Sequence, residues 1–275
     1  MGVLVIFGSE SDKPVYGKLM QMLEEKGVKA RLEICSAHRE PKRLEKILGE
    51  SAEPLVIAGA GLSAALPGFI ASHSDKLVIG IPVNSNYFGL DALLSIHQMP
   101  KGFTVLGTGV EAIAETVEGA ANILGGKKKI VLVTTEQSED VEKRRGQCAE
   151  KLQELGIPFE EREEDNYSDK SAVYIDFIEL GTVEAVDPEK QLVIFVPVKE
   201  DSEKKDALRL SALATRGLWV GLGRGENAAL CAKKILEIGK GTKAAGPTEQ
   251  AKTKKGDCNG KRKRPYNKKK ANRRP

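Results

Sequence analysis

Ser36, His38 and Arg39 are the residues of this chain whose types and spacing are best suited to chemistry. They follow a strand-like run at about residues 30–35, so a titratable ring and a permanently charged guanidinium leave the same turn. Histidine can exchange a proton near neutral pH, and arginine can bind an anion through two parallel hydrogen bonds. The group therefore predicts acid–base chemistry on a phosphorylated small molecule, although a solvated surface pair is the simpler alternative.

A second polar group, Ser9, Ser11 and Asp12, lies between the apolar run at residues 3–7 and a helix that Pro14 predicts. The free N–H groups at a helix start, with two hydroxyls beside them, form a ready site for a phosphate. An ordinary helix cap is the alternative, but one capping residue is enough for that purpose. We therefore predict that this loop contacts the ligand.

A glycine-rich segment, residues 59–68, follows the third apolar run. Its spacing, Gly-x-Gly-x-x-Ala from Gly59, is similar to a dinucleotide-binding fingerprint. We reject that interpretation because Pro67 and Gly68 interrupt the helix that the fingerprint needs. The next apolar run also ends at Asn84, where a ribose-binding acid is required. What remains is a glycine loop that lets the main chain approach a ligand.

Apolar runs and helical spacings alternate along the first 124 residues. Such alternation with short loops predicts a doubly wound parallel α/β sheet. Strands are expected near residues 3–7, 30–35, 55–58, 77–83 and 104–106, with helices between them. Open sheets of this kind bind ligands at the carboxyl ends of their strands, where all three segments described above lie.

The pattern restarts at Ile130, which predicts a second copy of the same unit. Apolar runs at residues 130–133 and 192–198 repeat the first and fourth runs of the first copy, and the second copy is shorter across the glycine loop. We predict two domains, a catalytic one over residues 1–126 and a structural repeat over residues 127–240.

The second copy keeps the strand pattern but lacks most of the polar residues that could act on a ligand. Tyr167 stands opposite His38, and only Ser138 is retained, opposite Ser9. Residues 221–230 show the reverse, because their glycine turn leads into an Asn-Ala-Ala sequence that the first copy lacks. The two copies therefore look complementary.

The formal charge of +4 is unevenly distributed. Residues 241–275 contain thirteen Lys or Arg and two acidic residues, a charge of +11, which leaves −7 for residues 1–240. An acidic body is atypical of a nucleic-acid-binding domain, and the tail has too few apolar residues to fold. We predict a disordered basic tail; since Tyr266 is its only aromatic residue, non-specific polyanion contact is favoured over specific RNA binding.

Other features narrow the class of protein. No run of about 18 apolar residues predicts a membrane span, and the chain starts without a signal-peptide pattern. The four cysteines lack Cys-x-x-Cys spacing, which argues against a zinc site and against a disulfide framework, so a cytoplasmic location is expected. His73 and His97 have no ligand spacing to another metal-binding residue, and we predict structural roles for both.

Residues 1 to about 124 resemble the phosphoribosylaminoimidazole carboxylases and carboxyaminoimidazole ribonucleotide mutases of purine synthesis. Any one matching segment is weak evidence of kinship, whereas seven in the family's order are specific. The segments are residues 8–12, 36–39, 58–61, 66–68, 80–83, 89–95 and 98–100. A further match, residues 224–229, belongs to the second copy, and the whole chain is similar to tandem archaeal forms.

The resemblance implies a three-layer α/β/α fold and an octamer with active sites between subunits. It implies that His38 is the general acid–base, and that Ser36 and Arg39 bind phosphate. It also implies that Ser9 and Asp12 contact the phosphoribosyl group. Further substrate-binding residues on this basis are Ser11, Gly59, Ala60, Gly61 and Leu66.

The implied substrates are a phosphorylated aminoimidazole nucleotide and carbon dioxide. The aminoimidazole ring carbon is nucleophilic, so neither a metal nor another cofactor is expected, and the site needs a dry pocket and one proton shuttle. Because the second copy would replace alternate subunits, we predict a lower-order homo-oligomer, such as a tetramer of two-domain chains.

Two reactions fit these residues. A mutase moves the carboxyl group from the exocyclic nitrogen to the ring carbon, whereas a direct carboxylase uses dissolved carbon dioxide. Arg39 favours the mutase, and the sequence Leu62-Ser63 with Ala65 resembles the direct carboxylases. We favour the mutase. A nickel-pincer cofactor carboxylase, suggested by the loop after Asn84, and a non-catalytic nucleotide-binding protein are the remaining alternatives.

Overall fold

The computed structural model describes residues 1–134, 138–163, 167–188 and 190–241. The predicted basic tail, apart from Gly241, lies outside the described residues. We call residues 1–126 the first half and residues 127–241 the second half. Within the described ranges, every helix is too short or too polar to cross a membrane.

The first half alternates strands and helices, and its strands begin and end within about two residues of the predicted positions. Its central strands are unbroken apolar runs, which suits parallel strands that are covered on both faces. The elements are β1 (Gly2–Phe7), α1 (Lys13–Glu25), β2 (Lys29–Ile34), α2 (Pro41–Glu50), β3 (Leu55–Ala60), α3 (Leu66–His73), β4 (Leu77–Pro82), α4 (Leu90–His97), β5 (Val105–Gly107) and α5 (Ile113–Leu124).

The second half has five strands and three helices among its described residues. The strands near residues 130–133 and 192–198 are confirmed, and two more lie between them. The elements are β6 (Lys129–Val133), α6 (Glu139–Glu154), β7 (Phe159–Arg162), β8 (Ala172–Glu179), β9 (Val193–Val198), α7 (Lys204–Leu213), β10 (Leu218–Trp219) and α8 (Gly225–Gly239).

The ten strands form one continuous sheet in the order β2-β1-β3-β4-β5-β10-β9-β8-β6-β7. Strands within each half pair in parallel, as predicted. The two halves meet where β5 and β10 pair antiparallel, Gly107 opposite Trp219, and we call this pairing the seam. In each half we number the five strands by their order along the chain. Counted outward from the seam, both halves then have the same order, which is fifth, fourth, third, first and second.

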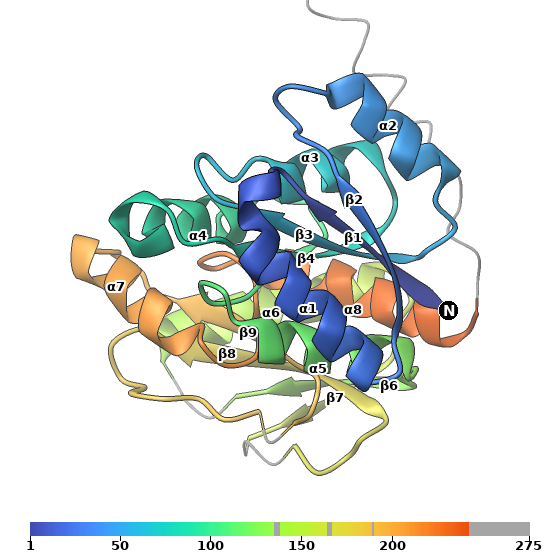
Figure 1. Ribbon diagram of the computed structural model, residues 1–275. Coiled ribbons are helices and arrows are strands. Elements are labelled where there is room, and N and C mark those ends of the chain that lie inside the picture. The colour runs from blue at the N-terminus through green and yellow to red at the C-terminus, as the bar shows by residue number, and fades with distance from the viewer. Residues whose placement is uncertain (135–137, 164–166, 189, 242–275) are drawn as a thin grey trace, which may run out of the picture.

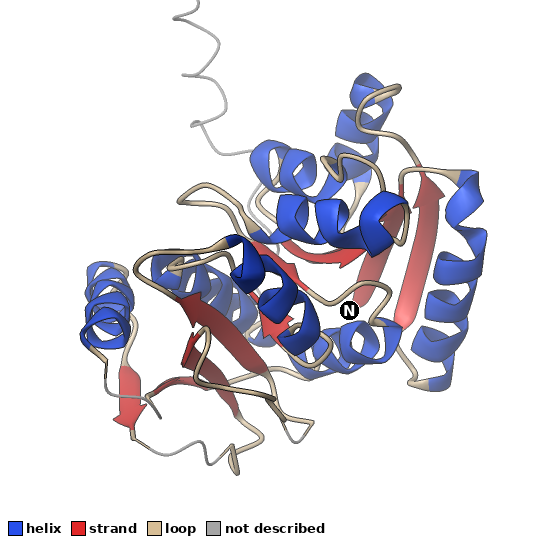
Figure 2. Cartoon of the chain, turned by 90° about the vertical axis from the view of Figure 1, so that its left-hand side faces the viewer, coloured by secondary structure: helices blue, strands red, loops and turns tan. Residues whose placement is uncertain are grey.

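Helices cover both faces of the sheet in the first half, as Figures 1 and 2 show. On one face α1 contacts α5, α5 contacts α8 and α8 contacts α6, so a single helix layer runs across both halves. On the other face α2 contacts α3, and α4 contacts α7. The described residues of the second half include no helix between β7 and β8 or between β8 and β9, so its second layer is thinner.

The hydrophobic core also crosses the seam. One cluster of buried side chains includes Leu106 and Val117 of the first half together with Leu218, Val220 and Ile235 of the second. Burial of apolar side chains is the main stabilising contribution to a fold, so neither half can be removed without exposing part of the core of the other.

The prediction that Pro67 and Gly68 interrupt a helix is wrong. Pro67 and Gly68 do not interrupt a helix, because they lie in the first turn of α3. Proline is tolerated there, since the first N–H groups of a helix have no partner within the helix. The rejection of a dinucleotide fingerprint therefore rests only on Asn84, which follows β4 in place of an acidic residue.

Candidate active site

The loops after β1 and β2 meet at the carboxyl edge of the sheet. The Arg39 guanidinium donates a hydrogen bond from Nη2 to the Gly8 carbonyl oxygen at 3.0 Å. Ser9, Ser36 and Arg39 consequently line one cavity of about 650 Å³. A cavity of this size is within the range that holds small ligands, and these three predicted residues are brought together in it.

The loop of residues 9–12 is ordered by its own hydroxyl groups. Ser9 Oγ accepts hydrogen bonds from the Ser11 main-chain N–H at 3.2 Å and from Ser11 Oγ at 2.7 Å. Ser11 Oγ also lies 3.2 Å from Asp12 Oδ1. Ser9 thus caps the short helical turn Glu10–Asp12, whereas the Asp12 side chain caps nothing at the start of α1. Capping explains part of this polar loop and leaves the Asp12 carboxylate for another role.

Partial burial raises the pKa of Asp12, the Ser11 hydroxyl lowers it, and the nearby negative charge of Glu111 raises it further. Glu111 lies in the loop after β5, adopts a positive φ of 52° and accepts a hydrogen bond from the Asn84 N–H at 3.1 Å. Glu111 could not be predicted from the sequence, because no local spacing connects it to Asp12. Only the fold brings the two carboxylates close.

His38 lies on an exposed turn immediately before α2. The Glu40 N–H donates to the Ser36 carbonyl oxygen at 2.9 Å, and the Arg39 N–H lies 3.4 Å from Ser36 Oγ, which closes the turn. The turn places His38 beside Arg39, and the imidazole is open to solvent. The ring is not among the residues that line the cavity.

Gly59, Ala60, Gly61 and Leu66 are not among the residues that line this cavity, although the Gly59 carbonyl oxygen accepts a hydrogen bond from the N–H of Gly8, which lines it, at 3.2 Å. Gly59 is buried in β3, where a Cβ atom would lie 2.0 Å from a ring carbon of Phe7, so packing alone requires glycine there. Leu66 is 3% exposed and belongs to the core on the α2 and α3 face of the sheet. The glycine loop can therefore present main-chain groups to a ligand, but the Leu66 side chain is buried in the core.

His73 and His97 have structural surroundings. The His73 ring stacks on Phe69 with centroids 4.0 Å apart. His97 is 1% exposed, and its Nδ1 lies 2.8 Å from the Leu93 carbonyl oxygen. Burial lowers the pKa of His97 to about 4. Its ring contacts Gly107 at the seam, since a Cβ on that glycine would lie 2.6 Å away.

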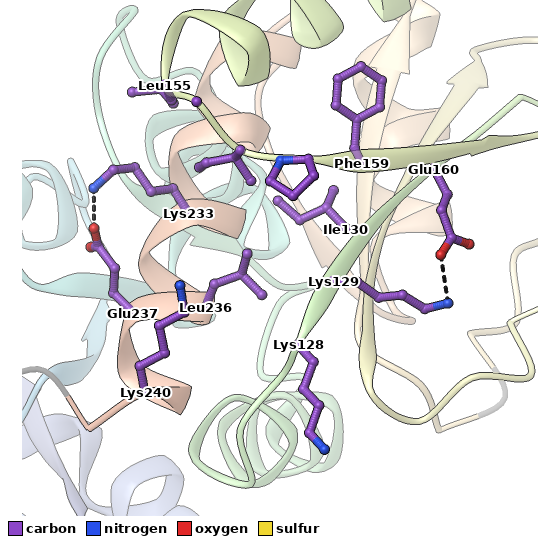
Figure 3. A pocket seen from close by; sticks show the side chains of 13 residues that line it. Lys128, Lys129, Ile130, Leu155, Phe159, Glu160, Lys233, Leu236, Glu237 and Lys240 are labelled. Carbon is purple, nitrogen blue, oxygen red and sulfur yellow. Dashed lines mark hydrogen bonds and ion pairs between the residues drawn. The ribbon is translucent and has the colours of Figure 1, made fainter.

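A second cavity, of about 410 Å³, lies at the amino ends of β6 and β7. Figure 3 shows four lysines around apolar side chains that include Leu155, Phe159 and Leu236. Two of these lysines have carboxylate partners, because Lys129 pairs with Glu160 at 2.9 Å and Lys233 pairs with Glu237. None of the predicted site residues lines this cavity, and it is at the opposite end of the strands from the carboxyl edge.

The fold and the site together define an α/β protein with hydroxyl groups and an arginine gathered at the carboxyl edge of a parallel sheet. A family described as AIR carboxylase matches residues 2–145, and the chain belongs to this family.

Curated relatives agree with this assignment. The N5-carboxyaminoimidazole ribonucleotide mutase of Methanocaldococcus jannaschii is 38% identical over 154 residues, which are 56% of this chain and 98% of the relative. The mutase of Pyrococcus horikoshii is 38% identical over 157 residues, 55% of this chain and 89% of the relative. The phosphoribosylaminoimidazole carboxylase of Candida glabrata is 37% identical over 161 residues, 55% of this chain and 28% of that protein.

Among solved structures, Treponema denticola PurE is 23% identical, with a TM-score of 0.37, over 56% of this chain and 97% of that one.

Proposed function

We propose that this protein is a carboxyaminoimidazole ribonucleotide mutase of purine biosynthesis. The observation that carries the proposal is the similarity to mutases over nearly their entire length, 98% in the case of the Methanocaldococcus jannaschii enzyme. The meeting of Ser9, Ser36 and Arg39 in one cavity supports it, because a phosphorylated substrate needs hydroxyl and cationic groups within one binding site.

We assign roles to the residues on this basis. Arg39 and Ser36 bind the phosphate, and Ser9 and Asp12 contact the ribosyl group. The main chain of residues 59–61, where β3 ends and the glycine loop begins, faces the base. His38 is the general acid–base, since an imidazole can exchange a proton near neutral pH. Its exposed turn leaves the ring free to approach a substrate held by its neighbour Arg39.

The chemistry needs one proton shuttle. His38 gives a proton to the exocyclic nitrogen as the bond from nitrogen to the carboxyl carbon breaks and carbon dioxide is released. The nucleophilic ring carbon then attacks the trapped carbon dioxide and forms a carbon–carbon bond. His38 takes the displaced ring proton, so the imidazole returns to its starting state. These steps require that water is kept out of the site, because the released carbon dioxide would otherwise be lost.

Direct carboxylation is the second candidate. The loop sequence Leu62-Ser63 favours it, and so does the similarity to the carboxylase of Candida glabrata. The two reactions form the same product and differ in the source of the carboxyl group.

The deciding experiment offers the purified full-length protein each substrate separately, with and without bicarbonate. We expect rapid conversion of the N-carboxylated nucleotide that does not depend on added bicarbonate. Faster conversion of the uncarboxylated nucleotide, proportional to bicarbonate, would support the direct carboxylase. Absence of product from both substrates would refute both reactions.

The second half has a supporting role in this proposal. It continues the sheet of the first half and shares its core, so a chain that ends at Gly125 would expose apolar side chains. We expect that truncation to aggregate or lose its assembly, and a soluble, assembled and active product would contradict this role. The homo-oligomer of two-domain chains, the polyanion contact of the tail and the cytoplasmic location stay predictions.

A further inference from the structure

The side chain of Asn227, in the second half, forms hydrogen bonds with the main chain of the first half. This residue is 2% exposed, and it lies in the first turn of α8. Its Nδ2 donates to the Pro100 carbonyl oxygen at 2.8 Å, and its Oδ1 accepts from the Gly102 N–H at 2.9 Å. Between these two bonds, Lys101 forms an ion pair with Glu226 at 2.9 Å. The loop of residues 98–102 is therefore fastened to α8 at three successive residues.

A side-chain amide is suited to this contact, because it can donate and accept at the same time. The main chains approach closely here: a Cβ atom on Gly221, just before α8, would lie 2.5 Å from the His97 carbonyl oxygen. Gly102 adopts a φ of +89°, which few other residues tolerate. An aspartate at position 227 would lose the bond to Pro100, and an alanine would leave both main-chain groups without this partner.

The same loop contacts the start of α3. Met99 Sδ lies 3.3 Å from the position that a Cβ atom on Gly68 would occupy. Gly68 is in the first turn of α3, which begins at Leu66, and the glycine loop, residues 61–65, joins this helix to β3. Asn227, the residue 98–102 loop, α3 and the glycine loop thus form one chain of contacts from the second half to the first.

We propose that Asn227 is a positioning residue for the site in the first half. By holding the main chain at Pro100 and Gly102, it fixes Met99 against α3 and so sets the position of the glycine loop. The proposal rests on the proposed function, because it takes that loop to face the substrate. It also gives the second half a specific task, since residues 107–112 of the first half lack the Asn-Ala-Ala sequence that follows Glu226.

The test compares Asn227→Ala with Asn122→Ala in the full-length protein. Asn122 is a matched control, because its Nδ2 also bonds across the halves, to the Lys190 carbonyl oxygen at 3.1 Å, and its hydrogen-bond partners Glu118, Lys127 and Lys190 lie outside the site. We expect the KM for the N-carboxylated nucleotide to rise at least fivefold in Asn227→Ala and to stay within twofold in Asn122→Ala. A purely structural role would instead lower the melting temperature and the yield of both variants with KM unchanged.

Two further measurements complete the test. Met99→Ala removes the contact with α3 while Asn227 is kept, so it should reproduce the rise in KM even if Asn227→Ala does not fold. Hydrogen exchange should become faster in residues 61–68 of Asn227→Ala and not in Asn122→Ala. Unchanged KM in Met99→Ala, or unchanged exchange in that segment, overturns the positioning role. A wild-type protein without activity on either nucleotide overturns the proposed function, and the exchange comparison still decides the positional link.

Discussion

The two halves of this molecule have the same strand order and differ at the carboxyl edges of their strands. In the first half, Ser36 and Arg39 leave this edge and line a cavity together with Ser9. In the second half, Tyr167 is 6% exposed, and its hydroxyl donates to the buried Asp176 carboxylate at 2.5 Å. Ser36 and Arg39 thus line a cavity, whereas Tyr167 and Asp176 are bonded to each other within the protein.

This contrast separates the scaffold from the loops. The buried strands of the second half continue the sheet and share the core with the first half. Among the described residues of the second half, no helix lies between β7 and β8 or between β8 and β9. Loops at the carboxyl edge contribute little to a core, so two halves with the same strand order can differ in their chemistry.

The largest expected effect is a loss of catalytic rate, and it should follow from substitutions in the first half alone. His38→Asn removes the proposed proton shuttle and should lower kcat about 10³-fold, within the range for loss of a general acid–base. Binding of the product nucleotide, measured by calorimetry, should change little because Arg39 is intact. Full turnover in this variant would contradict the assignment of His38 as the general acid–base. It would also weaken the contrast between the halves.

The seam should make the halves unfold together. Leu218 is 2% exposed, and its Cδ1 would lie 3.0 Å from a Cβ atom on Gly119 of α5. Leu218→Ala should lower the free energy of unfolding by about 3 kcal/mol, the usual cost of truncating a buried leucine. Urea unfolding followed by the fluorescence of Trp219, the one tryptophan, and by circular dichroism should show one coincident transition.

Leu208→Ala is the control for this experiment, because Leu208 lies on α7 and is 64% exposed. Its effect on stability should be within about 0.5 kcal/mol. Two separate transitions in the wild-type protein would show that the halves are independent domains, and would contradict the prediction that they unfold together.

The buried histidine at the seam predicts a dependence of stability on pH. Burial lowers the pKa of His97 from 6.5 to about 4, so the unfolded chain binds a proton there at a higher pH than the folded protein does. Stability should therefore fall as the pH decreases from 6.5 to about 4, by up to about 3 kcal/mol in total. Urea midpoints measured across this range should show the decrease, and His97→Gln should flatten that part of the curve. An equal slope in His73→Gln and His97→Gln would contradict the assignment.

The smallest effect concerns the buried pair of the second half. Tyr167→Phe removes the donor to Asp176 and should cost about 1 to 2 kcal/mol of stability, as expected for a buried polar group that loses a hydrogen bond. The KM and kcat of the first-half site should stay within twofold of the wild-type values. A large loss of activity at unchanged stability would mean that the second half takes part in the chemistry.

Much of the fold could be predicted from local sequence. The unbroken apolar runs identified β1, β3 and β4, because residues buried on both faces of a sheet have to be apolar whatever their neighbours are. The segments around Ser9 and Arg39 were expected to meet, since the carboxyl ends of parallel strands lie along one edge. The prediction for Leu66 was less informative, because an apolar residue after a glycine loop can face a ligand or the core, and here it faces the core.

The sequence by itself determined the succession of strands in the first half and the family to which the chain belongs, whereas the second half as a degenerate copy stays a prediction. Only the tertiary structure decided that the halves join through an antiparallel seam, that Glu111 lies near Asp12 and that Asn227 fastens the loop at Pro100. The physical reason is the range of the interactions. Hydrophobic periodicity acts over a few residues, whereas these contacts join segments far apart in the chain and exist only after the core common to both halves has formed.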